Sequence, residues 1–405
     1  MHHAPFLARS ETRRRVLVAA LLLAGITVPT PMAAAQPAVT RITLGDQVTI
    51  EGNGANADAG NVQITAGGVY ELSGMLDRGQ VNVDAPQADV ELILNGVDIT
   101  STNGPAILVR EAGNATITLA DGSRNRVEDG GDTDFDAAIA GDVSLTFGGE
   151  GALEVIGNQE EGIASTMHLT FTGGDYHIRA VEDGLNANND GVSVITISGG
   201  SIYIETETGD GIDSNGALTI TGGEVITQGA MEDMNGGLDA DGAVTIDGGE
   251  VIATGARLSV PVADSTQQSL LLQFDRTQNA NTLVVIQNSA GEDLLVFAPA
   301  LPFRQLLFSD AGIAAGETYT YFTGGSGEGE AVNGRYTAAS NPGTEVGTVT
   351  TASLDDARRR GPFGPPPDGM MPPPDGMMPP PDGMMPPPDG MAPPNAPPQA
   401  ATPAA

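Results

Sequence analysis

The sequence predicts an all-β protein, a right-handed parallel β-helix, because it repeats about every 25 residues, closes its strands with glycine pairs and lacks helical periodicity. The pattern Thr-apolar-x-Gly-Gly recurs at residues 170–174, 196–200, 219–223 and 245–249, after the related segment 145–149. The first glycines, Gly148, Gly173, Gly199, Gly222 and Gly248, stand 25, 26, 23 and 26 residues apart. This period suits one solenoid coil, whereas a propeller blade needs about 40 residues or more.

A secretory signal peptide is predicted for residues 1–35. Arginines precede the apolar run from Val16 to Val28, and Ala33 to Ala35 supply the small residues of a cleavage site. The run is shorter than the about 20 residues that cross a bilayer as a helix. We therefore expect a secreted protein, extracellular or periplasmic, without a transmembrane segment after signal cleavage.

The remaining chain divides into four segments. We expect an N-terminal β cap over residues 36–87, the parallel β-helix over 88–256, a C-terminal β-sandwich-like domain over 257–351, and a disordered tail over 352–405. The tail repeats Pro-Pro-Pro-Asp-Gly-Met-Met, and its proline triplets favour an extended chain without a core. Such a tail could contact the cell wall or outer surface.

Composition excludes several classes of function. The 405 residues contain no cysteine and no tryptophan, and the formal net charge is −35. Thiol nucleophiles, zinc thiolate sites and iron–sulfur clusters are excluded. An acidic surface of this strength repels nucleic acid, so no nucleic-acid partner is expected, and it suits a protein that binds cations.

Inside the repeat, alternation separates inward from outward positions. Each repeat has a further glycine at a second corner, namely Gly162, Gly184, Gly211 and Gly237. The residues that follow these glycines should form an inward column, and they are Ile163, Leu185, Ile212 and Leu238. The oxygen-bearing residues around it should form an outward strip, and the predicted metal ligands in this strip are Asp183, Asn186, Asn188, Asp210, Asp213, Asn215, Asp239 and Asp241.

Calcium is the predicted cofactor of this strip. Carboxylates stacked about 4.8 Å apart repel one another by about 1 kcal/mol even in water. Ca²⁺ would neutralise them because it accepts six to eight oxygen ligands in flexible geometry, whereas Mg²⁺ demands a stricter arrangement. The alternative is that Asp and Asn occupy these corners only because they favour turns.

At these residues the sequence resembles a family of bacterial secreted carbohydrate-binding β-helix proteins that bind calcium, polygalacturonate and cellulose, with pectate-lyase-like architecture and no established catalysis. The resemblance rests on residues 92–97, 116–122, 209–213 and 316–319 together with the Gly-Gly strands. It implies calcium along the helix and binding of acidic sugars such as polygalacturonate. The tail repeats match no part of the family pattern.

The predicted function is therefore non-catalytic binding of acidic polysaccharide, with calcium bridging protein and sugar carboxylates. His177, Arg179 and Tyr203 are the candidate carbohydrate-binding residues, although Arg179 could simply pair with Glu205 on the next coil. A calcium-dependent polysaccharide lyase is the enzymatic alternative, with Arg179 as its base. A surface or matrix adhesin with purely stabilising calcium is the third reading.

Overall fold

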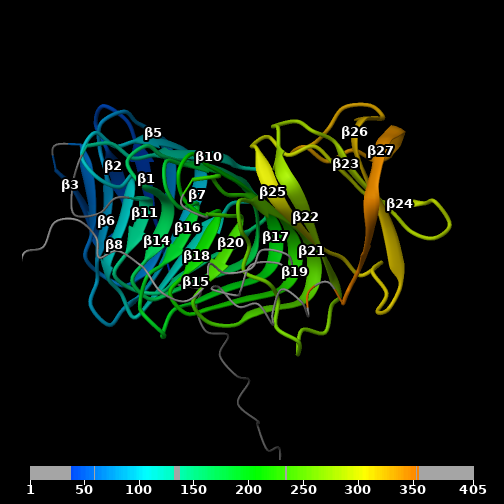
Figure 1. Cartoon of the computed structure of the whole chain (residues 1–405). Coiled ribbons are helices and arrows are strands. Elements are labelled where there is room, and N and C mark those ends of the chain that lie inside the picture. The colour runs from blue at the N-terminus through cyan, green and yellow to red at the C-terminus, as the bar shows by residue number, and fades with distance from the viewer. Residues whose placement is uncertain (1–37, 59, 132–136, 233–234, 353, 355–405) are drawn as a thin grey trace, which may run out of the picture. The chain divides into compact units, whose positions relative to one another are not determined.

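The computed structural model describes residues 38–354 except for 59, 132–136, 233–234 and 353. The predicted signal peptide and nearly all of the predicted tail lie outside the described residues. Most of the described strands form a β-solenoid of about eight turns, whose parallel strands stack in chain order (Figure 1). The predicted all-β parallel solenoid is confirmed. In the described part of the chain, no helix is long and apolar enough to span a membrane.

Two long sheets build the solenoid. The larger has 14 strands, which are β1 (Val39–Leu44), β2 (Thr49–Glu51), β5 (Gly68–Leu76), β7 (Asp89–Thr100), β9 (Asn114–Leu119), β10 (Arg124–Glu128), β12 (Leu145–Gly149), β13 (Ala152–Gly157), β15 (His168–Ala180), β17 (Val194–Thr206), β19 (Ala217–Gln228), β21 (Val244–Gly255), β22 (Ser269–Gln278) and β25 (Phe303–Ser309). The second has nine, which are β3 (Ala55–Asp58), β4 (Asn61–Ile64), β6 (Val81–Asp84), β8 (Ile107–Glu111), β11 (Ala137–Gly141), β14 (Glu161–Ser165), β16 (Leu185–Ala187), β18 (Ile212–Ser214) and β20 (Leu238–Ala240).

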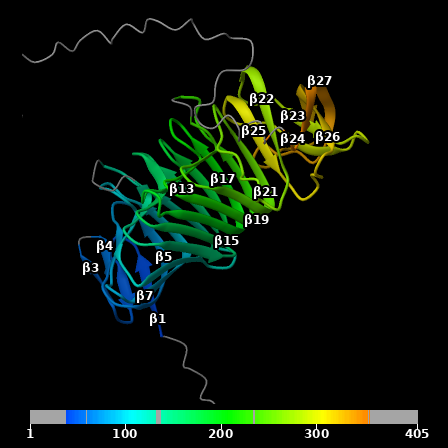
Figure 2. The ribbon, with the colours of Figure 1, turned by 60° about the horizontal axis from the view of Figure 1, so that its bottom comes forward.

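Four long strands of the larger sheet, β15, β17, β19 and β21, each bend at a glycine pair. In β15, β17, β19 and β21 we call the segment before the pair the first arm and the segment after it the second arm (Figure 2). Gly200 bends β17 with φ +91°, and a Cβ there would lie 2.6 Å from the carbonyl oxygen of Gly174 on the preceding coil. Only glycine meets both conditions, the left-handed backbone and the close approach between coils.

The core of the solenoid consists of stacked columns of like residues. Ile163 pairs with Leu185, Leu185 with Ile212, and Ile212 with Leu238, and all four are fully buried. Before the glycine pairs, Phe147 of β12 stacks on Phe171 of β15, with ring centroids 4.9 Å apart. The predicted inward column is therefore confirmed, because parallel in-register pairing carries one side-chain alternation from coil to coil.

The N-terminal segment differs from the separate β cap predicted over residues 36–87. β1 pairs in parallel with β5, β5 with β7, and β4 with β6, so this segment forms the first coils of the solenoid. Single glycines, Gly74 and Gly96, provide the positive-φ bends here, so the Gly-Gly signal is missing. The antiparallel strands β2 and β3 alone lie beyond the parallel ladder.

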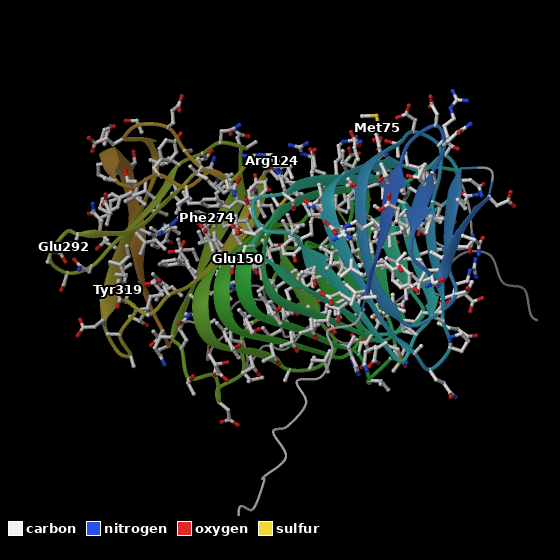
Figure 3. All side chains as sticks on the ribbon, turned by 180° about the vertical axis from the view of Figure 1, so that it is seen from behind. Met75, Arg124, Glu150, Phe274, Glu292 and Tyr319 are labelled. Carbon is white, nitrogen blue, oxygen red and sulfur yellow. The ribbon has the colours of Figure 1, made fainter. Side chains whose placement is uncertain are left out.

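The C-terminal segment continues the solenoid before it forms a second layer. β25 pairs antiparallel with β21 and β22, so both extend the larger sheet. A four-stranded sheet of β23 (Val284–Gln287), β24 (Asp293–Phe297), β26 (Thr318–Gly327) and β27 (Ala339–Thr350) lies at this end. Phe274 and Tyr319, labelled in Figure 3, belong to the apolar cluster that joins the two layers.

This apolar cluster also includes three residues from the outer face of the solenoid. Tyr203, Ile226 and Ile252 occupy successive coils of one outward column on the second arm, and all three are buried in the cluster. Arg335 adds an ion pair to Glu250, with an N–O distance of 2.6 Å. The C-terminal segment thus covers the last coils on their outer side.

Two single glycine substitutions test the energetic importance of the bend. We expect Gly200→Ala to lower the free energy of unfolding by more than Gly191→Ala, because both residues have positive φ but a Cβ on Gly191 meets nothing within 4 Å. The left-handed conformation alone costs about 1–2 kcal/mol. Chemical denaturation of both variants would measure the difference, and equal losses would show that the backbone collision at Gly200 has no energetic effect.

Candidate functional site: an acidic column and an adjoining cleft

Aspartates at the start of the second sheet's strands bind the turn of the next coil. The Asp183 Oδ1 accepts a hydrogen bond from the Asp210 backbone N–H at 2.8 Å. Asp210 repeats the contact one coil later, where its Oδ1 accepts from the Gly236 N–H at 2.6 Å. These carboxylates therefore have a structural role as turn caps, as the turn-based reading of the sequence predicts.

The same turns bring further oxygen-bearing side chains into register. Asn186 pairs with Asp213, and Asp213 with Asp239, on the outward face of β16, β18 and β20. The Asn186 Nδ2 donates to the Asp183 Oδ2 at 2.8 Å. The Asn186 side chain is buried, yet its Oδ1 has no hydrogen-bond partner among the described residues. We call Asp183, Asn186, Asp210 and Asp213 the acidic column.

Burial and neighbouring carboxylates disfavour the ionised form of the aspartates in this column. Burial, followed by the charges of Asp183 and Asp239 among others, raises the pKa of Asp213 to about 7. Burial and the neighbouring acids likewise raise the pKa of Asp210 to about 7. The pKa of Asp183 is also raised, mainly by burial. The charge of Asp239 contributes to all three shifts, so the like charge of neighbouring carboxylates adds to the effect of burial.

The donor set fits a hard cation such as Ca²⁺. Carboxylate and amide oxygens are its ligands, and the unpaired Asn186 Oδ1 supplies one that the protein leaves unused. The ligand atoms of another set of acids nevertheless lie closer together than those of the acidic column. Within the described ranges, the three acidic groups whose ligand atoms all lie within 4.8 Å of one another are Glu160, Glu161 and Glu182.

The other predicted metal ligands lie at the edge of this column or have different partners. Asn215 donates to the Asp190 Oδ1 at 2.8 Å, which sets it in a separate polar group with Asn188. Asp239 is exposed, and its Oδ1 accepts from the Ser259 hydroxyl at 2.6 Å. Asp241 is exposed and contributes to the raised pKa of Asp213. The structure thus brings together half of the predicted set.

The three predicted carbohydrate-binding residues share one face but differ in access. His177 pairs with Tyr203 and Arg179 with Glu205 in neighbouring coils, as alternation predicts. The Arg179 guanidinium lies 3.5 Å from Glu154 and 3.9 Å from Glu205, and its side chain is 52% exposed. The sequence-based alternative of a cross-coil ion pair therefore matches the geometry.

Tyr203 is not on the open surface, contrary to its predicted outward exposure. It is 6% exposed because the C-terminal segment covers its column. Its hydroxyl donates to Glu205 and accepts from the Gln228 Nε2 at 3.0 Å. The half-buried His177 ring lies edge-on to Tyr203, with ring centroids 4.8 Å apart. Tyr203 therefore cannot stack on a sugar in this arrangement.

A cleft of about 610 Å³ opens beside Arg179, where four coils meet a loop of the C-terminal segment. Its walls come from residues 156–158, 179–181, 205–207 and 230–232 of the solenoid and from Leu301 and Pro302. Arg179, Glu205, Glu207 and Glu232 supply its charges. The cleft-lining segments 179–181 and 205–207 are followed by residues 182–186 and 209–213, which contain the acidic column. The cleft and the acidic column therefore occupy the same corner of the coils.

Sequence reasoning missed Gln228, which holds this loop. Gln228 is fully buried, and its Oε1 accepts hydrogen bonds from the N–H groups of Ala300 at 2.7 Å and Leu301 at 3.3 Å. A signal for the covered face existed in the sequence. The outward column on the second arm changes from Glu154 and His177 to Tyr203, Ile226 and Ile252 along the chain.

Comparison with known proteins identifies the family. The profile described as "Carbohydrate-binding domain-containing protein" matches residues 58–289, more than half of the chain. The chain belongs to this carbohydrate-binding family. A relative of the same description from Acetivibrio thermocellus is 33% identical over 137 residues, which cover 32% of this chain and 48% of the relative. The match thus spans about half the length of that relative.

A solved structure from C. thermocellum, described as a polysaccharide lyase-like protein, is similar to part of the chain. It shares 28% sequence identity at a TM-score of 0.44, and the alignment covers 56% of this chain and 98% of that structure. The family match, together with the parallel solenoid, confirms the predicted resemblance to carbohydrate-binding β-helix proteins.

The raised pKa values predict how stability depends on pH in a chelating buffer. Because the pKa of Asp213 is raised from 3.8 to about 7 by folding, the folded state binds more protons than the unfolded state between these values, and stability falls as pH rises through this window. Asp213→Asn should therefore raise the melting temperature at pH 8 and change it little at pH 4.

Thermal unfolding in EDTA at the two pH values measures this effect. The control is Asp121→Asn, at an exposed turn residue outside the acidic column. The effect of this substitution on the melting temperature should be the same at pH 4 and pH 8. If Asp213→Asn shifted the melting temperature equally at both pH values, the electrostatic account of the acidic column would be wrong.

Proposed function

We propose that this family member is a secreted, non-catalytic protein that binds acidic polysaccharide and holds calcium at the acidic column. The observation that carries the proposal is the buried, unpaired Asn186 Oδ1 beside acids whose pKa values are raised by burial and mutual repulsion. A buried carbonyl oxygen without a partner costs free energy that a bound cation would recover.

The residues of the column have distinct parts in this proposal. Asp210 and Asp213 would supply carboxylate oxygens, and Asn186 would supply its free amide oxygen, while Asp183 orients the Asn186 side chain. When bound, Ca²⁺ would supply open coordination positions for carboxylates of the polysaccharide. This would allow a protein with a net charge of −35 to bind an anionic ligand.

The environment of Arg179 supports a binding function over catalysis. A lyase base must accept a proton, but a guanidinium stays protonated in proteins. Glu154 and Glu205 both form ion pairs with the Arg179 guanidinium. Because no lysine exists in the chain, no lysine base can replace it. Polysaccharide binding without bond cleavage is the function that this arrangement fits.

Export and surface contact extend the same proposal. Secretion is predicted from residues 1–35, and contact with a cell wall or outer surface is predicted from the tail repeats. Both segments lie outside the described residues. An exported protein would meet polysaccharides and calcium outside the cytoplasm. Sizing of the protein recovered from culture medium or periplasm would test whether residues 1–35 are removed.

Retention on immobilised polygalacturonate tests the central claim. We expect retention in the presence of CaCl₂, loss of retention in EDTA, and at least about tenfold weaker retention for Asp213→Asn, because that variant loses a carboxylate ligand. Asp121→Asn is the matched control and should behave as the unmodified protein. A CaCl₂ titration monitored by thermal unfolding should raise the melting temperature through binding to the folded state.

Each alternative predicts a different outcome of these measurements. Release of unsaturated uronate products from polygalacturonate would establish a lyase. Calcium stabilisation without polygalacturonate retention would indicate an adhesin with structural calcium. If CaCl₂ and EDTA changed neither stability nor retention, the calcium proposal would be wrong.

A further inference from the structure

The cleft beside Arg179 crosses four successive coils of the solenoid. Ile156 pairs with Arg179, Arg179 with Glu205, and Glu205 with Gln228, so the wall segments follow one another at the coil spacing. Three intervals of about 4.8 Å extend these walls over about 14 Å along the solenoid. The volume of about 610 Å³ lies within the about 300–1,000 Å³ typical of small-molecule sites. The cleft therefore has room for an elongated small molecule.

Most of the residues that line the cleft are apolar. Ile156, Val181 and Met231 belong to the solenoid walls, and Leu301 and Pro302 form the wall from the C-terminal segment. Such walls favour a ligand with an apolar body, because each methylene group that becomes fully buried strengthens binding by up to about fourfold.

The wall from the C-terminal segment is held in place by the protein itself. Gln228 is fully buried, and its Oε1 accepts hydrogen bonds from the N–H groups of Ala300 at 2.7 Å and Leu301 at 3.3 Å. The Gln228 Nε2 donates to the Tyr203 hydroxyl at 3.0 Å. Because the loop is ordered by these bonds, a ligand does not have to order it on binding.

The charged side chains of the lining leave the cleft negative. They are one guanidinium, on Arg179, and three carboxylates, on Glu205, Glu207 and Glu232, so the lining carries a formal charge of −2. The Arg179 guanidinium already lies 3.5 Å from Glu154 and 3.9 Å from Glu205. Glu207 and Glu232 are exposed and have no ion pair among the described residues. Their carboxylates are therefore available to a cation.

A second group of acids follows the first two wall segments of the cleft. Glu160 comes shortly after Asn158, and Glu182 comes directly after Val181. The ligand atoms of Glu160, Glu161 and Glu182 all lie within 4.8 Å of one another. Carboxylates thus occur beside the first two coils of the cleft as well as beside the last two, and acids gathered around low-dielectric walls concentrate the attraction for cations.

We propose that this cleft binds a linear aliphatic diamine in its doubly protonated form. The alkyl chain packs against the apolar walls, one ammonium group meets Glu207 and Glu232, and the other lies toward Glu182. An alkylammonium group resembles the lysine side chain, whose pKa is about 10.4, so both ends stay charged at neutral pH. The proposal goes beyond calcium and polysaccharide binding and depends on neither.

The apolar walls set the affinity in this proposal, and the carboxylates select the charge of the ligand. An exposed ion pair strengthens binding by only up to about fivefold, because water and salt screen it. Burial of the alkyl chain therefore contributes most of the affinity. General attraction of cations to a chain with a net charge of −35 would instead depend on ligand charge and not on chain length.

Isothermal titration calorimetry at physiological ionic strength tests the site, with the purified full chain in EDTA. The probes are the terminal diamines diaminobutane, diaminohexane and diaminooctane, which carry the same charge. We expect affinity to rise with chain length, by at least about tenfold from diaminobutane to diaminooctane. Octanediol has the chain of diaminooctane without its charge, and it should bind at least about fivefold more weakly.

Substitutions in the lining test where the diamine binds. Glu207→Gln and Glu232→Gln should each weaken diaminooctane binding several-fold, whereas Arg179→Met should strengthen it, because this variant loses a positive charge and keeps the apolar stem. Glu150→Gln and Arg124→Met are the matched controls and should leave binding unchanged. Glu150 and Arg124, labelled in Figure 3, are exposed and do not line the cleft.

The proposal would be overturned if diaminobutane and diaminooctane bound equally, if octanediol bound as tightly as diaminooctane, or if the two glutamate variants behaved as Glu150→Gln does. Weaker diaminooctane binding by Arg179→Met would also contradict it. None of these measurements involves calcium or polysaccharide. Failure of polygalacturonate retention in CaCl₂ would thus reject the proposed function and leave the result for the cleft standing.

Discussion

The fixed spacing between stacked coils is the constraint on which the rest of this structure depends. Parallel in-register pairing sets equivalent residues about 4.8 Å apart, so every choice at one position is repeated against itself on the next coil. Apolar side chains benefit from this repetition, as the buried column of Ile163, Leu185, Ile212 and Leu238 shows. Glycine is required where the backbones approach most closely, as between Gly200 and Gly174.

The same spacing makes a column of acids unfavourable. Asp183 and Asp210 cap the turns of the following coils, and this hydrogen bonding explains their presence. Burial raises the pKa values of Asp183, Asp210 and Asp213, and neighbouring carboxylates raise them further, because burial and like charge both disfavour ionisation. A cation would relieve that repulsion and would also satisfy the Asn186 Oδ1. Structural capping and cation binding are therefore compatible roles of one set of residues.

The C-terminal segment gives the solenoid a feature that repetition alone cannot produce. A uniform stack presents a uniform face, but the loop at Leu301 and Pro302 interrupts that face and closes one side of a cleft. Gln228 links this loop to the stack through hydrogen bonds to Ala300 and Leu301. The acidic column and the cleft then offer two different environments, one dominated by carboxylates and one by apolar walls, at the same corner of the coils.

Sequence periodicity by itself determined the parallel solenoid, the inward columns and the register of His177 with Tyr203, because a repeat with a strict alternation allows one way to bury its apolar residues. It also located the acidic strip around Asp183, Asp210 and Asp213. Only the tertiary structure decided that residues 39–87 join the solenoid, that Tyr203 is covered, and that Arg179 borders a cleft with Leu301. The physical reason is that register between neighbouring coils follows from local repeats, whereas contacts between a coil and a segment about 100 residues later follow from packing that no repeat encodes.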